Sequence, residues 1–166
     1  MVSFAKGYGL SIKGFRYMIP FTRRELNNAF KANYNASLPT ESTTSNAQRL
    51  LLFYAIECGL KAAILKQTRR SITVEMPSIG EAGHDLKKLM KQLKIDGQFK
   101  LPRELKLNDV SLKTRAPKTQ RKAPFKDLNQ IWRYGGRCIK IDNFHNDAEI
   151  EVILKKIYNW IKGELI

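Results

Sequence analysis

An apolar segment near the middle of the chain, residues 45–65, constrains the fold more than any other part of the sequence. Ser45 and Gln48 have the spacing of a capping box, in which each side chain satisfies a free backbone N–H at the start of a helix. The residues behind this start are apolar on nearly every face of a helix, and they are Ala47, Leu50 to Ile56, Cys58, Leu60 and Ala62 to Leu65. Because a helix that is apolar all round must be covered on all sides, we expect it at the centre of a helical bundle.

Two further segments carry helix signals near the ends of the chain. Thr22 and Glu25 have capping-box spacing, and a helix is expected over about residues 22–34. Asn146 and Glu149 have the same spacing before a last helix. Its apolar residues recur every three or four positions, and they are Ile150, Ile153, Leu154, Ile157, Tyr158 and Ile161. Such a stripe indicates a helix with one buried face.

Residues 78–97 predict an amphipathic helix. Ser78 and Glu81 would cap its start, and Gly97 would end it. Its apolar stripe is Leu86, Leu89, Met90 and Leu93, and the opposite face carries Lys87, Lys88, Lys91 and Lys94. The pattern predicts a half-exposed helix that presents a lysine face to solvent. A shorter helix that ends at two glycines is indicated by Phe125, Leu128, Ile131 and Trp132.

The rest of the chain is consistent with one largely α-helical domain over residues 1–166, a length that can bury a sizeable core. Residues 1–20 mix glycine, aromatic and basic residues without a helical stripe, and they predict a short irregular or extended arm. Two isolated cysteines form neither a disulfide framework nor a metal-binding pair, so we expect a reducing cytoplasm, no metal site and no cofactor. The longest apolar run, residues 50–56, is too short to cross a bilayer, and no membrane association is expected.

The charge balance points to an anionic partner. Thirty Lys and Arg against fifteen Asp and Glu give a formal net charge of +15. Residues 1–124 carry 23 basic and 9 acidic groups, a net +14, whereas residues 125–166 carry 7 and 6, a net +1. An excess of this size favours nucleic acid, an acidic protein or an anionic surface as partner, and charge alone does not choose among them.

Residues 100–122 form a basic connector. Eight Lys or Arg face only Glu104 and Asp109, and two prolines interrupt the segment. We expect it to cross the surface as a long loop with at most a short helix. Together with the lysine face it supplies the candidate RNA-binding residues, which are Lys87, Lys88, Lys91, Lys94, Lys113, Arg115, Lys118, Arg121 and Lys122.

Three pieces of the sequence resemble the HEPN-like superfamily. Residues 51–62 (LLFYAIECGLKA) and 83–89 (GHDLKKL) are similar to its second and third helices, and residues 132–134 (WRY) add to the likeness. The resemblance covers about residues 45–137. It implies an all-α antiparallel bundle of four or five helices that often forms a homodimer. It also implies membership of a group rich in metal-independent endoribonucleases from toxin–antitoxin, CRISPR-linked and phage-defence systems.

The ribonucleases of that superfamily carry an arginine followed by four to six residues and then a histidine, and this motif is missing here. Thirteen residues separate Arg70 from His84, and seven separate Arg137 from His145. Two glycines break the second segment, so a shared helical face is not expected there. Either the activity is lost in this chain, or it is rebuilt from other positions.

Four residues are candidates for catalysis. His84 and His145 are the two histidines, and histidine is the side chain that titrates most readily near neutral pH. Arg133 and Arg137 flank a tyrosine and two glycines, which would let the backbone approach a phosphate. Each has a simpler structural explanation. His84 with Asp85 would open a helix, Arg133 and Arg137 would belong to a plain helix C-terminal stop, and a polar loop accounts for His145.

Glu57 lies among apolar residues in the helix expected to be most buried. An ionised carboxylate there needs a partner. Lys61, one turn further along, is the nearest, and the His84 imidazole is another if antiparallel packing brings it alongside. We expect a structural polar contact rather than catalysis. A histidine at a helix start is also expected to have a lowered pKa.

The sequence therefore predicts a HEPN-like RNA-binding protein of a prokaryotic or mobile-element defence or toxin system, and it leaves open whether that protein is a metal-independent endoribonuclease. One alternative is a catalytically inactive HEPN-like adaptor that docks a partner protein, such as an acidic antitoxin. Another is a small basic DNA-binding protein, for which the charge suffices although no recognition-helix motif is present.

Overall fold

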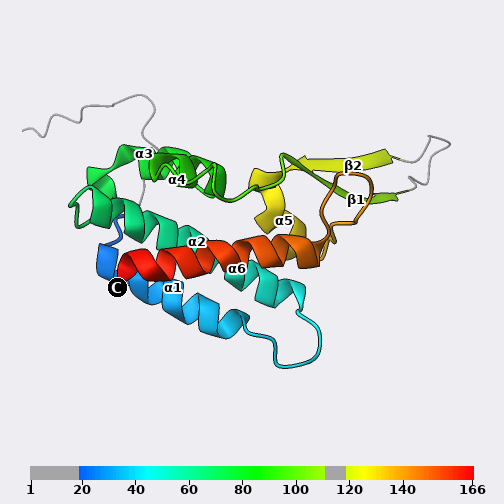
Figure 1. Ribbon diagram of the computed structural model, residues 1–166, viewed down its shortest axis with the longest axis horizontal. Coiled ribbons are helices and arrows are strands. Elements are labelled where there is room, and N and C mark those ends of the chain that lie inside the picture. The colour runs from blue at the N-terminus through cyan, green and yellow to red at the C-terminus, as the bar shows by residue number, and fades with distance from the viewer. Residues whose placement is uncertain (1–18, 111–118) are drawn as a thin grey trace, which may run out of the picture.

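Helix α2 (Asn46–Gln67) lies at the centre of the computed structural model, which describes residues 19–110 and 119–166. Helices α1 (Arg23–Ser37) and α6 (Asp147–Leu165) run beside it, and α4 (Leu86–Gln92) and α5 (Leu128–Arg133) contact it from the other side (Figure 1). The mainly helical fold predicted from the sequence is thus confirmed.

The predicted central helix is confirmed in detail. Ser45 and Gln48 form the capping box, and the side chains of α2 are buried on nearly every face. Gly59 lies where α2 meets both long neighbours. A Cβ atom added there would lie 2.6 Å from Phe30 Cδ2 of α1 and 2.7 Å from Ile161 Cγ2 of α6. The glycine therefore allows the three helices to pack closely around one core.

The first and last helices also begin where the capping boxes placed them. The Thr22 N–H donates to Glu25 Oε2 at 2.7 Å, and the Asn146 N–H donates to Glu149 Oε2 at 3.1 Å. Helix α1 continues to Ser37, three residues beyond the predicted end. The apolar stripe of α6 faces the core through four fully buried residues, Ile150, Leu154, Ile157 and Ile161.

The helix predicted over residues 78–97 is wrong as a single element. The chain forms α3 (Pro77–Ala82) and α4, with a turn between them. Gly83 has φ 57°, a conformation that only glycine adopts readily, and it stops α3. The expected capping box at Ser78 does not form, because the Ser78 hydroxyl donates to Gln92 Oε1 instead. The short 3₁₀ turn Thr73–Glu75 leads into α3.

The basic connector is also corrected by the structure. Strands β1 (Glu104–Val110) and β2 (Thr119–Pro124) pair as an antiparallel hairpin in place of the expected loop. Leu105 and Leu107 of β1 are buried, which anchors the hairpin to the core. The other edge of β1 is bridged at Cys138, where the Ile139 N–H donates to the Lys106 carbonyl at 2.9 Å. A 3₁₀ turn, Phe125–Asp127, then connects β2 to α5, the short helix predicted before the two glycines.

Some predictions lie outside the described residues. These are the arm, apart from Ile19 and Pro20, and the candidate RNA-binding residues Lys113, Arg115 and Lys118. Within residues 19–110 and 119–166, no helix combines the length and the apolar character that crossing a membrane requires.

Candidate active site

Side chains from three separate elements meet around His84. Tyr54, Glu57 and Lys61 project from one face of α2, because they are three and four residues apart. His84 lies in the turn between α3 and α4, and Arg133 is the last residue of α5. These five residues are called the His84 cluster below.

Glu57 lies at the buried end of the cluster. His84 Nδ1 lies 2.7 Å from Glu57 Oε2, and Lys61 Nζ donates to Glu57 Oε1 at 2.6 Å. Burial raises the pKa of Glu57, but the hydrogen bond from His84 and the charge of Lys61 together bring that pKa below its usual value. Glu57 is therefore an ionised, doubly partnered carboxylate, and both partners are the ones that the sequence predicted.

His84 combines a fixed position with an accessible ring. Its Nδ1 is held by the buried carboxylate, yet 60% of its side-chain surface is exposed. The hydrogen bond with Glu57 raises the pKa of His84, while burial opposes the shift. The expectation of a lowered pKa was wrong, because the contact with Glu57 outweighs burial and the positive charges of Lys61 and Arg133. Asp85, not His84, caps α4, and its Oδ1 accepts from the Lys87 and Lys88 N–H groups.

Replacing Glu57 with glutamine should lower the pKa of His84 toward its ordinary value, because the variant removes the negative charge that stabilises the imidazolium. The measurement is an NMR titration of the histidine ring protons in both proteins. His145 provides the internal control, since no hydrogen bond or ion pair of the described residues joins it to Glu57, and its curve should be the same in both. A His84 curve that does not move would show that Glu57 does not set the protonation of the ring.

Arg133 brings a second functional group to the cluster. Its Nη2 donates to Tyr54 Oη at 2.9 Å, and the side chain is exposed. The ring centroids of Tyr54 and His84 are 6.2 Å apart. The positive charge of Arg133 is close enough to oppose protonation of His84. The structure thus brings together two of the four residues that the sequence singled out for catalysis.

His145 and Arg137 are not part of this cluster. No hydrogen bond or ion pair in the described part of the chain connects either residue to His84. His145 lies in the loop before α6, and its buried Nδ1 has no hydrogen-bond partner among residues 19–110 and 119–166. Arg137 is exposed, two residues after Gly135. The sequence could not separate the two histidines, because their difference arises from packing against α2.

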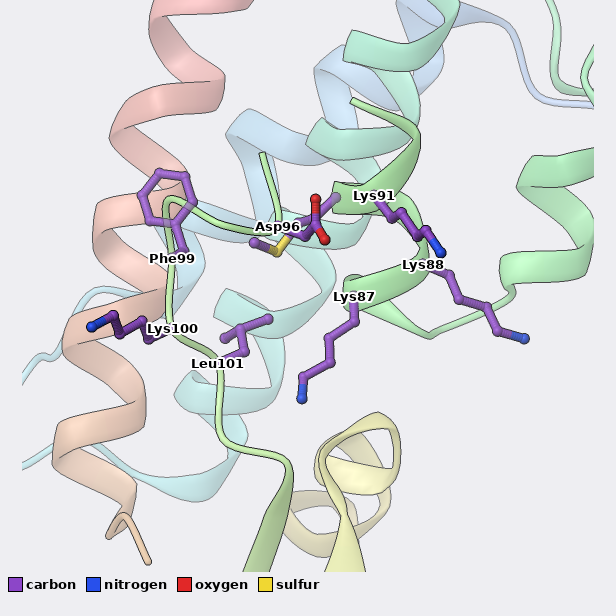
Figure 2. A pocket seen from close by; sticks show the side chains of 8 residues that line it. Lys87, Lys88, Lys91, Asp96, Phe99, Lys100 and Leu101 are labelled. Atoms are coloured by element: carbon purple, nitrogen blue, oxygen red, sulfur yellow. The ribbon is translucent and has the colours of Figure 1, made fainter. Parts of the chain in front are cut away.

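The lysine face of α4 lines a hollow of about 300 Å³ with Lys100, Asp96 and Phe99 (Figure 2). Its lysines do not converge on one point. Lys88 and Lys91 extend to the same side, whereas Lys100 points to the opposite side (Figure 2). Lys87 points toward the segment that carries Phe125, and its Nζ lies 5.9 Å from that ring. Burial lowers the pKa of Lys87. This surface offers distributed charge rather than a closed anion pocket, and Lys94 lies beyond it as an exposed residue.

A second hollow, of about 460 Å³, lies between β2 and α5. It brings together Arg121 and Lys122, both predicted to bind RNA, with Tyr134, which the sequence analysis did not select. Lys122 Nζ also lies 5.5 Å from the ring of Phe144. Tyr134 is 79% exposed. In the sequence it stands between Arg133 and the two glycines, as the last residue of the WRY piece.

Two further findings bear on the chemistry of the molecule. In the described part of the chain, no group of three or more His, Cys, Asp or Glu side chains is arranged to hold a metal ion. Comparison with known proteins finds no matching family model, and it finds neither a curated protein nor a solved structure with significant similarity to the chain.

Proposed function

We propose that the protein binds RNA and cleaves it without a metal ion, with His84 as the general acid and Arg133 as the cation that stabilises the reacting phosphate. One observation carries the proposal. An exposed imidazole lies 2.7 Å from a buried, ionised carboxylate, and beside it lies an exposed guanidinium that a hydrogen bond to Tyr54 holds in place. Cleavage of RNA without a metal ion needs proton transfer and stabilisation of the charge that develops on the phosphate, and a fixed histidine and an arginine are suited to these two functions.

The raised pKa of His84 favours the acid role over the base role, since the contact with Glu57 stabilises the protonated ring. In the proposed reaction the ribose 2′-oxygen attacks the adjacent phosphorus, and its proton leaves to water. The bond from phosphorus to the 5′-oxygen breaks, and the departing oxygen takes a proton from His84. The products are a 2′,3′-cyclic phosphate and a 5′-hydroxyl, and His84 regains its proton from solvent.

Arg133 is suited to the second function. It keeps donors beyond the one that it gives to Tyr54, because a guanidinium has five N–H groups in a planar fork. Such a fork grips two phosphate oxygens at once as negative charge develops on them. The contact with Tyr54 holds Arg133 beside His84 without neutralising its charge. Glu57 acts through His84, as a positioning residue.

Under this proposal the chain is a diverged HEPN-like bundle whose catalytic pair has been rebuilt. The superfamily places arginine and histidine on one helix, whereas here α5 supplies Arg133 and the turn before α4 supplies His84. The large positive charge attracts the RNA. A role as a toxin or in defence, with a homodimer or an acidic antitoxin as partner, is part of the same proposal. The free thiols Cys58 and Cys138 accord with a reducing cytoplasm.

A second candidate function is favoured by the other contact of Glu57. The carboxylate also pairs with Lys61 at 2.6 Å, and both of its partners satisfy a charge that would otherwise be buried alone. If that is their purpose, the cluster is structural. The protein would then be an adaptor that binds RNA or a partner protein without cutting.

The proposed chemistry predicts that the purified protein cleaves single-stranded RNA in the presence of EDTA and leaves 5′-hydroxyl and 2′,3′-cyclic phosphate ends. End-labelling of the products checks both groups. An RNA with a single 2′-deoxy residue should resist cleavage at that position and be cut elsewhere, because the attacking oxygen is missing there. Binding of intact RNA without cleavage would favour the adaptor, and cleavage that EDTA abolishes would contradict the metal-independent reaction.

A further inference from the structure

We propose that the groove between β2 and α5 holds an unpaired base of a single-stranded RNA against the ring of Tyr134. The inference rests on the proposed function and names its substrate class, an RNA strand that is not paired at the site of cleavage. It is carried by an exposed aromatic ring on a rigid turn, by the composition of the groove, and by the direct chain connection between that ring and Arg133.

Tyr134 is exposed although its backbone is firmly held. Its N–H donates to the Gln130 carbonyl at 3.0 Å, and the next two N–H groups donate back to the last turn of α5 at 3.3 and 2.8 Å. Gly135 has φ 73°, which allows this tight ending of the helix. The turn therefore fixes the backbone of Tyr134, while the residue itself remains 79% exposed. A flat, rigid, accessible aromatic surface costs little conformational entropy when it binds another ring.

The groove beside Tyr134 is lined by both apolar and polar residues. The apolar ones are Leu107, Ala123, Ile131 and Gly136. Gly136 is tightly enclosed there, since an added Cβ would lie 2.9 Å from Ile131 Cγ2 and 3.0 Å from its carbonyl oxygen. The polar lining residues are Gln120, Arg121, Lys122, Asp127 and Gln130. This arrangement fits a nucleobase, which has apolar faces and hydrogen-bonding edges.

The polar residues of the groove offer an interaction for each part of a nucleotide. Arg121 and Lys122 attract the phosphates, while the amides of Gln120 and Gln130 donate and accept hydrogen bonds at the edge of a base. Asp127 adds an acceptor for an exocyclic amino group. Aromatic rings beside cations are the combination by which proteins bind single strands. A base inside a double helix is already stacked on both faces, so only an unpaired base can lie on Tyr134.

The groove and the His84 cluster are joined through consecutive residues. Arg133 reaches Tyr54 of the cluster, and the residue that follows it lines the groove. In the proposed complex, a strand with one base on Tyr134 passes its backbone toward Arg133. In this arrangement the groove selects unpaired RNA, and Arg133 binds the phosphate of the nucleotide whose base lies in the groove.

Binding of a 2′-O-methyl RNA oligonucleotide, which resists attack by the 2′-oxygen, tests this inference on the intact protein. Tyr134→Ala should weaken single-strand binding by roughly 5- to 150-fold, the range that the loss of one stacked base implies. Tyr134→Phe should bind as the wild type does, and the affinity for duplex RNA should not change in either variant. Phe21→Ala, which removes an aromatic ring that is 44% exposed at the start of the first helix, is the matched control and should have no effect.

A 2-aminopurine in the oligonucleotide reports stacking directly. Its fluorescence should be quenched on binding to the wild type and to Tyr134→Phe, and less so with Tyr134→Ala. Unchanged single-strand affinity in Tyr134→Ala, or an equal loss for duplex RNA, would overturn the inference even if RNA is cleaved. Binding that depends on Tyr134 in a protein that does not cleave RNA would support the groove and overturn the proposed function.

Discussion

Replacing His84 with alanine is expected to slow RNA cleavage by about 10²- to 10⁴-fold, the range that a positioned acid or base contributes. The variant removes the proton that the departing 5′-oxygen takes, while Arg133 and its contact with Tyr54 stay in place. Single-turnover cleavage of a defined oligonucleotide gives the rate without the contribution of product release. The affinity for RNA should change little, because the loss concerns the transition state.

Two controls separate catalysis from folding in this experiment. His145→Ala should cleave at the wild-type rate, since His145 lies in the loop before α6 and outside the His84 cluster. The pH dependence is the second control. The acid role requires a protonated ring, so the rate falls as pH rises through the raised pKa of His84. In Glu57→Gln this fall should begin at lower pH. Full activity in His84→Ala, or an inactive His145→Ala, would contradict the assignment.

The contact between His84 and Glu57 also makes the stability of the fold depend on pH. A group whose pKa is raised on folding contributes stability below its unfolded value, and the contribution is lost as pH rises through the folded value. His84 therefore stabilises the fold in mildly acidic solution. Glu57 has the opposite sign, because its pKa is lowered on folding and its contribution is lost as pH falls through that value. The salt bridge is thus strongest between the two pKa values, where both groups are charged.

The parts of the fold that could be predicted are those with local causes. The capping boxes at Thr22, Ser45 and Asn146 each act over three residues, and all three helices begin where the sequence placed them. The break at Gly83 could not be predicted in this way, because the stripe of α4 continues the spacing of α3. The only strand signal in β1 is the pair Leu105 and Leu107. Its pairing partner, β2, lies beyond a stretch of basic residues.

The contacts of the candidate site differ in the same way, because some have local causes and others do not. The pairing of Glu57 with Lys61 follows from helix geometry, because the two residues are one turn apart. The contact between Arg133 and Tyr54 joins residues 79 positions apart, and no pattern in the sequence specifies it. The direction of the His84 pKa shift was mistaken for the same reason. The sequence around His84 indicates only the helix start that follows it, whereas the residue with the largest effect on its pKa, Glu57, lies on α2.

The basic surfaces of the protein lead to a prediction about salt. Changing Lys88, Lys91, Arg121 and Lys122 together to glutamine should flatten the dependence of RNA affinity on salt. Each phosphate contact to a single strand contributes about 0.7 to the slope of log affinity against log salt, so four lost contacts remove roughly three units. The affinity ratio between wild type and variant should consequently rise by about 50-fold between 200 and 50 mM salt. Fluorescence anisotropy over that range measures it.

All four residues line the two hollows, Lys88 and Lys91 on α4 and Arg121 and Lys122 on β2. All four are exposed, and none takes part in an ion pair within the described part of the chain. The matched control removes the same charge from exposed positions on the first and last helices, namely Arg24, Lys31, Lys156 and Lys162. If RNA follows the two hollows, only the first variant flattens the slope. Equal flattening in both variants would mean that the net charge attracts RNA without a defined path, and an unchanged slope in the first would place the phosphate contacts on other residues.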